Sequence, residues 1–217
     1  MTSLIHPSSL ISKSVSLGSN VKIGPYCNLD GNISIGDNTI LKSHISVSGN
    51  TEIGSDNIFY PFSNIGCEPQ DLKFKGEDSE LIIGNNNIFR EYVTIHLPTK
   101  LKLKTIIGDN NYFMDSSTID HDCYIENNIT LSSHTILGGN VTLMKNCQLG
   151  IRTSVHQNQI IGSYSMIGMN SVITKKLNVR PGYIYYGKPA KKIKKNTIGL
   201  KKNKVTPETL KKEYKNI

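Results

Sequence analysis

One short segment of the sequence places an aspartate directly after a histidine, a pairing that general-base catalysis uses. Residues 119–123 read Ile-Asp-His-Asp-Cys. A neutral His121 could remove a proton from an attacking hydroxyl or amine. Asp122 could hold the imidazole in one tautomer and stabilise its protonated form. The pair is therefore a candidate for acid–base chemistry, and the alternative interpretation is an ordinary His–Asp pair on the surface.

A six-residue repeat would position this pair. Aliphatic residues or Phe recur at every sixth position from Ile5 to Ile65, at 83, 89 and 95, and again from Ile107 to Val179. A helix cannot keep a six-residue period on one face, whereas short strands separated by corners can. Glycine often follows the aliphatic residue, and we expect it to adopt corner angles that a Cβ would forbid. Positions one and five of each hexad should point into the core.

The repeat predicts an all-β fold that consists of one β-helix and a short C-terminal tail. Three hexads make one triangular coil, and about nine coils stacked at ~4.8 Å give a parallel β-helix. Residues 1–187 form this β-helix, with loops at 66–82 and 97–106 that interrupt the repeat without losing its phase. Residues 188–217 form a short basic tail that is partly helical. Thr206-Pro207 predicts the start of a helix, and Tyr183–Tyr186 predicts a cap on the core.

The coil length also groups further residues with the histidine. A step of one coil stacks Gly139 over His121 at about 5 Å and Gln157 at about 10 Å, and His156 lies beside Gln157. An unshielded Gly139 N–H could stabilise the oxyanion of a tetrahedral intermediate by about 3 kcal/mol. This set favours acyl transfer. Zinc binding by His121, His134 and His156 is the rival interpretation, but they lack the close two-His spacing of usual zinc sites, so we expect no metal.

Charge and cysteine content narrow the class of protein. The net charge is +8, and the segment from Lys188 to Ile217 has eleven Lys and two Glu. This tail could meet anionic lipid, substrate phosphates or an acidic protein, or stay solvated. The basic residues are not interleaved with aromatic residues that could stack on bases, so we do not expect nucleic-acid binding. We expect neither a signal peptide nor a membrane span, because the sequence shows no positively charged start followed by an apolar block and no apolar run of membrane-span length. Four Cys without CxxC spacing predict reduced thiols and a cytoplasmic protein.

Several segments, taken together, resemble one family, the UDP-N-acetylglucosamine O-acyltransferases of lipid A (lipopolysaccharide) biosynthesis. This family belongs to the hexapeptide-repeat acyltransferases, whose β-helix is left-handed. The resemblance covers nearly the whole chain. The segments that carry it are Ile5-His6-Pro7, Gln70-Asp71-Leu72-Lys73 with Gly76-Glu77, Arg90–His96, His121-Asp122-Cys123, Val155-His156-Gln157, and Asn196 with Gly199–Lys202.

The resemblance implies an activity and an assembly. It implies a left-handed β-helix in a homotrimer, with active sites in the clefts between subunits. It implies transfer of a 3-hydroxyacyl chain from acyl carrier protein to the 3-position of UDP-N-acetylglucosamine, with no further cofactor. His121 would then be the general base, Asp122 its partner and Gly139 the oxyanion donor.

The resemblance also assigns binding residues. Contacts to the sugar nucleotide or the acyl donor would come from Asp71, Lys73, His96, His156 and Gln157, and contacts to the nucleotide end from Asn196 and Lys202. Met169 falls at the position that limits acyl length, and its bulk predicts a shorter chain than Gly would allow. Met169 lies on a different prism face from His121, so it could reach that site only from a neighbouring subunit.

Four positions depart from the family pattern and keep the acceptor open. Thr118 and Asn140 replace histidines, Ile198 replaces a Glu, and Lys202 replaces an Arg, whose planar two-pronged phosphate contact a Lys cannot make. A 3-amino analogue of the sugar is therefore a second possible acceptor. Gly187–Lys191 resembles the ending of coenzyme A-dependent sugar acetyltransferases, which is an alternative function. A non-catalytic trimeric scaffold is the third interpretation.

Overall fold

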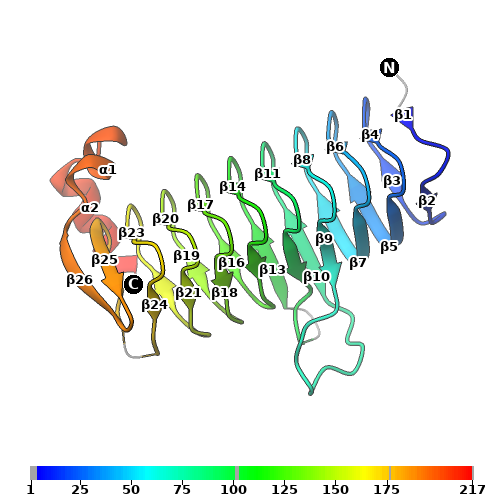
Figure 1. Ribbon diagram of the computed structural model, residues 1–217. Coiled ribbons are helices and arrows are strands. Elements are labelled where there is room, and N and C mark those ends of the chain that lie inside the picture. The colour runs from blue at the N-terminus through cyan, green and yellow to red at the C-terminus, as the bar shows by residue number, and fades with distance from the viewer. Residues whose placement is uncertain (1–3, 101–102, 176, 217) are drawn as a thin grey trace.

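The computed structural model describes residues 4–100, 103–175 and 177–216, and its chain winds into a solenoid of short strands (Figure 1). One sheet stacks ten parallel strands and ends with an antiparallel one. In spatial order these are β1 (Leu4–Ile5), β4 (Lys22–Ile23), β6 (Ile40–Leu41), β8 (Ile58–Phe59), β11 (Ile88–Phe89), β14 (Tyr112–Phe113), β17 (Thr130–Leu131), β20 (Gln148–Leu149), β23 (Met166–Ile167), β25 (Tyr183–Gly187) and β26 (Ala190–Lys195).

The remaining strands cover the other two faces of the prism and join through β5 and β7, which each run along both faces. In chain order they are β2 (Leu10–Ile11), β3 (Ser16–Leu17), β5 (Asn28–Ile35), β7 (Ser46–Ile53), β9 (Asn64–Cys67), β10 (Glu80–Ile83), β12 (Thr94–His96), β13 (Lys104–Ile107), β15 (Thr118–Ile119), β16 (Tyr124–Ile125), β18 (Ile136–Leu137), β19 (Thr142–Leu143), β21 (Ser154–Val155), β22 (Ile160–Ile161) and β24 (Val172–Ile173).

The strand pairing has the eighteen-residue step that the repeat predicts. Ile119 pairs with Leu137, and Leu137 with Val155, in parallel register. The predicted parallel β-helix is confirmed, and the ten stacked strands of the first sheet are close to the nine coils expected. The left-handed winding stays a prediction.

The core is filled by hexad positions one and five, as expected. Position one carries a stack of rings, with centroids 4.5 Å apart between Phe59 and Phe89 and 5.1 Å between Phe89 and Phe113. Position five carries a buried amide ladder in the same coils. Asn87 donates its Nδ2 to Asn57 Oδ1 at 3.0 Å and accepts the backbone N–H of Asn111 at 2.8 Å. This ladder pairs backbone groups that water cannot reach.

The prediction for the corner glycines was wrong in its physical reason. Gly24 and Gly150 do not have positive φ. A Cβ on Gly24 would overlap the Lys42 carbonyl of the next coil, and one on Gly150 would lie 2.6 Å from the Met169 nitrogen. These glycines therefore allow coils to approach closely. Left-handed angles recur instead at hexad position four, where asparagine, which tolerates that conformation, is the most frequent residue.

Two loops leave the solenoid, and both keep its register. Ile53 pairs with Ile83 across the first loop, and Ile83 pairs with Ile107 across the second. The first loop runs between β9 and β10 and projects from the prism in Figure 1. The second runs between β12 and β13, so β13 already begins at Lys104, inside the predicted 97–106 loop. Residues 101–102 of that prediction lie outside the described residues.

A hairpin and two helices close the C-terminal end. Tyr185 on β25 is only 1% exposed and packs in the main core, which confirms the predicted cap. The turn between β25 and β26 coincides with the predicted boundary between the β-helix and the tail, at residues 187 and 188. The division into these two parts stays a prediction. Helix α1 (Thr197–Lys202) was not expected. Helix α2 (Pro207–Glu213) begins at Thr206 as predicted, because the Thr206 side chain accepts from Thr209 N–H. A short 3₁₀ helix, η1 (Tyr214–Asn216), follows.

Buried Glu213 fixes this end to the solenoid. Ser163 donates to Glu213 Oε2 at 2.7 Å, and Lys145 Nζ lies 2.8 Å from Oε1. Burial raises the pKa of Glu213, but the hydrogen bonds and charge of Lys145 and Ser163 outweigh it and leave the pKa below its ordinary value. Neither α1 nor α2 has the length and apolar character to cross a membrane, and the same holds for every helix in the described part of the chain.

Candidate active site

His121 and Asp122 form a close pair at the corner after β15. His121 Nδ1 lies 2.7 Å from Asp122 Oδ2, and both side chains are largely buried, at 17% and 13% exposed. Asp122 has a φ of 61°, so it occupies the left-handed corner position. This turn brings its carboxylate back towards the preceding side chain. The pair leaves Nε2 of His121 as the ring nitrogen that can exchange a proton with a substrate.

Gly139 lies directly against the His121 ring. The register of β15 and β18 stacks the two residues, and Asn140 N–H donates to the His121 carbonyl at 2.8 Å. A Cβ on Gly139 would lie 2.6 Å from His121 Nε2 and would overlap Cε1. Among the described residues, no acceptor takes the Gly139 N–H. Because Gly139 has no side chain, the His121 imidazole can lie directly beside the unpaired Gly139 N–H.

A groove of about 640 Å³ runs past this pair and is walled by the first loop. Gln70, Asp71, Leu72 and Lys73 line one side, and His121, Gly139, His156 and Gln157 line the other. Asp71 fixes the loop locally, because its Oδ1 accepts the Lys73 N–H at 2.9 Å. Six of the site residues expected from the sequence thus meet in one groove, although they come from positions 71 to 157.

His96 lies next to this site but beneath its surface. It is 3% exposed, and its Nδ1 lies 3.5 Å from Asp120 Oδ1 without a hydrogen-bond partner among the described residues. Burial lowers the pKa of His96 below its ordinary value, and the nearby Asp120 carboxylate only partly opposes this. His96 does not line the groove, whereas Asp120 does. A substrate contact by His96 therefore stays a prediction.

Three residues that the sequence did not single out hold the His–Asp pair in place. Thr99 donates both its Oγ1 (2.8 Å) and its N–H (3.2 Å) to the Asp122 carboxylate. Thr105 Oγ1 accepts the Asp122 N–H at 3.1 Å. Asp120 Oδ1 accepts the His121 N–H at 3.0 Å. Only Asp120 had a signal in the sequence, since it adjoins His121; Thr99 reaches the site through the fold of the second loop.

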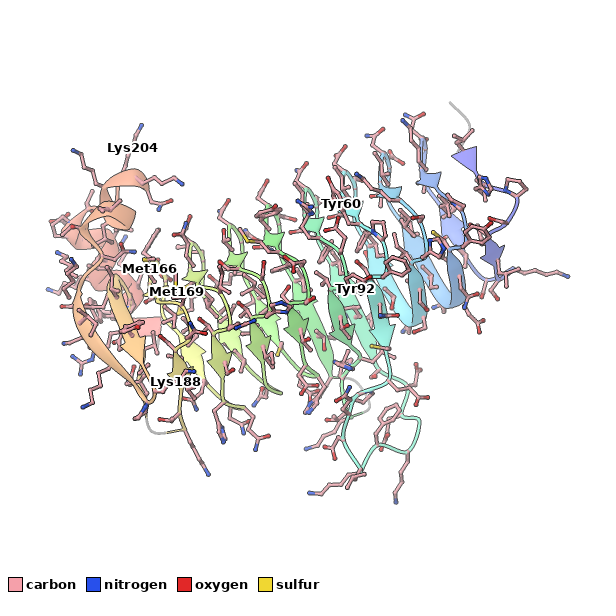
Figure 2. The ribbon with its side chains drawn as sticks, in the orientation of Figure 1. Tyr60, Tyr92, Met166, Met169, Lys188 and Lys204 are labelled. Carbon is pink, nitrogen blue, oxygen red and sulfur yellow. The ribbon has the colours of Figure 1, made fainter. Side chains whose placement is uncertain are left out.

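The other predicted site residues lie elsewhere on the chain. Asn196 is buried and caps α1, accepting from Gly199 N–H at 3.1 Å and donating to the Tyr164 carbonyl at 2.9 Å. Asn196 and Lys202 line a second pocket, between the outer face of the first sheet and α1. Met169 is 56% exposed and lies towards the C-terminal end of the solenoid, where Figure 2 labels it. It is not among the residues that line the groove of its own chain. Their roles stay predictions.

The residues that depart from the family pattern occupy strand, corner and helix positions of the fold. Thr118 lies on β15, and exposed Asn140 donates its Nδ2 to Asn158 Oδ1 at 2.7 Å. Ile198 is 83% exposed on α1. His134, invoked for zinc, does not line the groove that holds His121 and His156. In the described ranges, no three His, Cys, Asp or Glu side chains gather as metal ligands.

Comparisons with known proteins agree with one another. No family model matches the chain. The chain is 41% identical over 122 residues to an acyl-[acyl-carrier-protein]–UDP-N-acetylglucosamine O-acyltransferase from Rickettsia bellii, covering 56% of this chain and 43% of the relative. It is 48% identical over 119 residues to the Akkermansia muciniphila protein of the same name, covering 55% of the chain and 46% of the relative. These matches span less than half the length of the curated relatives.

A solved structure matches nearly the whole chain. The UDP-N-acetylglucosamine acyltransferase of Francisella novicida superposes with a TM-score of 0.91 at 33% identity. The superposition covers 98% of this chain and 78% of that protein. The shared architecture therefore extends through the solenoid, its loops and the C-terminal end.

Proposed function

The chain belongs to the family of UDP-N-acetylglucosamine O-acyltransferases, and from that membership we propose that it is an acyltransferase of lipid A biosynthesis. It transfers a 3-hydroxyacyl chain from acyl carrier protein to the 3-position of UDP-N-acetylglucosamine, or of an analogue with an amine at that position. One observation carries the proposal. His121, bonded to Asp122, lies against the unpaired N–H of Gly139 in a groove walled by residues 70–73.

The reaction follows from these groups. His121 Nε2 removes the proton of the acceptor hydroxyl as its oxygen attacks the thioester carbonyl carbon. The Gly139 N–H donates to the oxyanion of the tetrahedral intermediate, and Asp122 stabilises the imidazolium through Nδ1. The C–S bond then breaks, and the proton on His121 passes to the leaving thiolate. No Ser or Cys nucleophile is required, because the acyl group passes directly to the acceptor.

The assembly belongs to the same proposal. The enzyme works as a homotrimer, and each groove is completed by a neighbouring copy that contributes Met169. The position of Met169 outside the groove of its own chain supports this arrangement. Asn196 and Lys202, which line the second pocket, contact the nucleotide end of the acceptor. A cytoplasmic location stays a prediction.

A mass-resolved assay tests the activity. The purified protein is given UDP-N-acetylglucosamine, or its 3-amino analogue, with hydroxyacyl carrier proteins of several chain lengths. Acetyl-coenzyme A is supplied as donor in parallel. We expect a UDP-linked hydroxyacyl product whose rate falls about 10²–10⁴-fold in His121→Ala, the range typical of a general base. His134→Ala, which alters an exposed histidine outside the groove, is the matched control.

Three outcomes would count against the proposal. If His121→Ala formed product at the wild-type rate, His121 would not be the general base. Acetyl transfer from coenzyme A alone would favour the sugar acetyltransferase. No product with any donor or acceptor, from a folded protein, would favour the trimeric scaffold.

A further inference from the structure

Asp120 places a further carboxylate in the groove, next to the base, and the reaction described above does not use it. Its side chain is 29% exposed and lines the groove together with His121 and Gly139. Its Oδ1 accepts the His121 N–H at 3.0 Å. Among the described residues, its Oδ2 has no hydrogen-bond partner. One oxygen therefore fixes the backbone of the base, and the other can bind a ligand in the groove.

No basic side chain balances the charge of Asp120. In the described part of the chain, the ion pairs include none between Asp120 and a Lys or Arg. Lys73 lines the opposite wall of the groove without forming such a pair. Burial lowers the pKa of the neighbouring His96 below its ordinary value, so this ring is neutral at pH 7. The wall beside the base therefore carries an uncompensated negative charge.

The buried ring of His96 shows that Asp120 is not part of a closed internal hydrogen-bond pair. His96 is 3% exposed, and its Nδ1 has no hydrogen-bond partner among the described residues. The 3.5 Å from this nitrogen to Asp120 Oδ1 is longer than a hydrogen bond. Buried polar atoms in native proteins nearly always have a partner. A structural His–Asp pair would close this distance, so the geometry points to a ligand as the partner of the carboxylate.

The stacking of the coils leaves space beside Asp120. The register of β15, β18 and β21 places Gly138 one coil beyond Asp120 and His156 one coil further. All three line the groove, and at ~4.8 Å per coil Asp120 and His156 flank a gap of roughly 10 Å. His156 Nδ1 donates to the Gln157 carbonyl at 3.0 Å, which leaves its Nε2 as an acceptor. The groups around the gap accept hydrogen bonds, so the gap fits a ligand group that donates them, and not a phosphate.

We propose that Asp120 binds the acceptor sugar at its attacking group and selects an amine there over a hydroxyl. The inference rests on the proposed function, which leaves both acceptors open. A sugar that enters the groove displaces water from the Asp120 carboxylate, and an unpaired charge is costly to remove from water. An ammonium group offsets this cost with an opposite charge and a charge-assisted hydrogen bond, whereas a hydroxyl offers only the hydrogen bond.

The amine reaction uses the same base and one additional proton acceptor. His121 Nε2 removes one proton from the bound ammonium, and the freed lone pair forms the C–N bond at the thioester carbonyl carbon. The Gly139 N–H donates to the oxyanion as before. The C–S bond breaks, and His121 passes its proton to the leaving thiolate. The nitrogen, which is cationic after the attack, gives its second proton to Asp120 Oδ2, from which it passes to water.

A substitution that removes the charge but keeps the shape tests Asp120. Asp120→Asn retains an oxygen that can accept the His121 N–H, so the base stays in place. Asp30→Asn is the matched control, because Asp30 occupies the same hexad position four strand pairings earlier and does not line the groove. Each protein receives hydroxyacyl carrier protein with equal amounts of UDP-N-acetylglucosamine and its 3-amino analogue. Mass and stability to mild alkali distinguish the amide product from the ester, and thermal unfolding confirms that each variant is folded.

We expect the wild-type protein and Asp30→Asn to show a kcat/KM roughly tenfold or more higher for the amine than for the hydroxyl. In Asp120→Asn, kcat/KM for the amine should fall about tenfold to a hundredfold, because a neutral amide cannot offset the ammonium charge. The kcat/KM for the hydroxyl should change by less than about threefold, and the KM for the acyl donor should stay the same. Calorimetric titration with each UDP-sugar, without donor, should show a loss of affinity for the amine alone. Should Asp120→Asn fail to fold, the competition and the titrations with the wild-type protein still decide.

Other results would overturn the inference. Equal losses for both acceptors in Asp120→Asn would restrict Asp120 to holding the backbone of His121. Unchanged rates in this variant, or a wild-type preference for the hydroxyl, would show that the carboxylate does not select the acceptor. Absence of product with either acceptor would contradict the proposed function instead. The calorimetric titrations would then still test Asp120, because binding needs no turnover.

Discussion

The chemistry of His121 depends on how firmly Asp122 is held. The Asp122 carboxylate accepts hydrogen bonds from the hydroxyl and the N–H of Thr99, and the Asp122 N–H donates to Thr105 Oγ1. Hydrogen bonds to a carboxylate are stronger than those between neutral groups. Thr99 is thus a positioning residue, because it acts on the reaction only through Asp122.

Replacing Thr99 with Val should slow catalysis without weakening substrate binding. The change keeps the shape but removes the hydroxyl, which loses one charge-assisted hydrogen bond of about 1.5–3 kcal/mol. We expect kcat to fall about tenfold to a hundredfold, with little change in KM. Steady-state kinetics of the proposed reaction measure this. Thr99→Ser should recover most of the rate, and equal losses in Val and Ser would contradict the role of the hydroxyl.

His96 should make stability depend on pH. Burial lowers its pKa below the ordinary value of 6.5, so the native state favours the neutral ring. The unfolded state therefore binds more protons once the pH falls below about 6.5. The contribution of His96 to stability is complete above that pH and is lost as the pH falls through the lowered pKa.

A His96→Gln variant should remove this part of the pH dependence. Asp120 and His121, which face His96, are present in both proteins, so the comparison isolates the change at residue 96. Urea unfolding at a series of pH values from about 7 to about 5 should show a smaller loss of free energy in the variant. Parallel curves for the two proteins would show that His96 titrates equally in both states.

At the scale of elements, two-residue strands are too short to be stable alone, so the ladders between coils hold them. The Asn57–Asn87–Asn111 ladder joins three successive coils at the point where the two loops leave the solenoid. Asn87 also donates to the Gly108 carbonyl at 2.9 Å. The ladder therefore keeps the core in register in the coils that carry the first loop, which walls the groove.

Removing Asn87 should destabilise the solenoid strongly. Asn87→Ala leaves the Asn111 N–H and the Gly108 carbonyl without the side chain that pairs with them, while Asn57 Oδ1 keeps only the backbone N–H of residue 87. Each buried orphan costs about 1–3 kcal/mol, so we expect the free energy of unfolding to fall by about 3 kcal/mol. Asn64→Ala, which changes an exposed asparagine on β9, should cost about 0.5 kcal/mol or less. Urea denaturation compares the two, and similar losses would argue against the ladder.

At the scale of the whole molecule, a single chain leaves its groove open on one side. Loop residues 70–73 and the stacked corners provide the walls within one subunit. Met169 lies on another corner of the prism, next to Asn170 and beyond the reach of its own His121. The proposed trimer would bring this corner against the groove of a neighbour.

In this proposed trimer, Met169 would set the length of the acyl chain from the neighbouring subunit. Met169→Ala enlarges the end of the proposed chain site, so we expect the preferred hydroxyacyl donor to lengthen by two or more carbons, roughly in proportion to the volume removed. Competition among carrier proteins of different chain lengths, read by mass, measures the preference. Ile160→Ala, at an exposed position of β22, is the control. An unchanged preference in a trimeric Met169→Ala would contradict the assignment.

The six-residue period was enough to predict the solenoid, its register and the stacking of His121, Gly139 and Gln157. It could do so because each hexad packs against its copy one coil away, so a local period fixes a repeating contact. The helix start at Thr206 was also readable, since a cap depends on neighbouring residues. The reason for the corner glycines was predicted wrongly. Glycine is required both where coils approach closely and where φ is positive, and the sequence does not distinguish the two cases.

The contribution of the two loops to the site could not be predicted from the sequence pattern. Thr99 lies 23 residues before Asp122, in a segment without the repeat, so no period relates the two residues. The closure of the groove by Asp71 and Lys73 likewise depends on how the first loop folds back over the coils. Asn196, expected at a nucleotide, also proves to cap α1. Such contacts join distant segments through irregular backbone, whose path is set by long-range packing rather than by any local pattern.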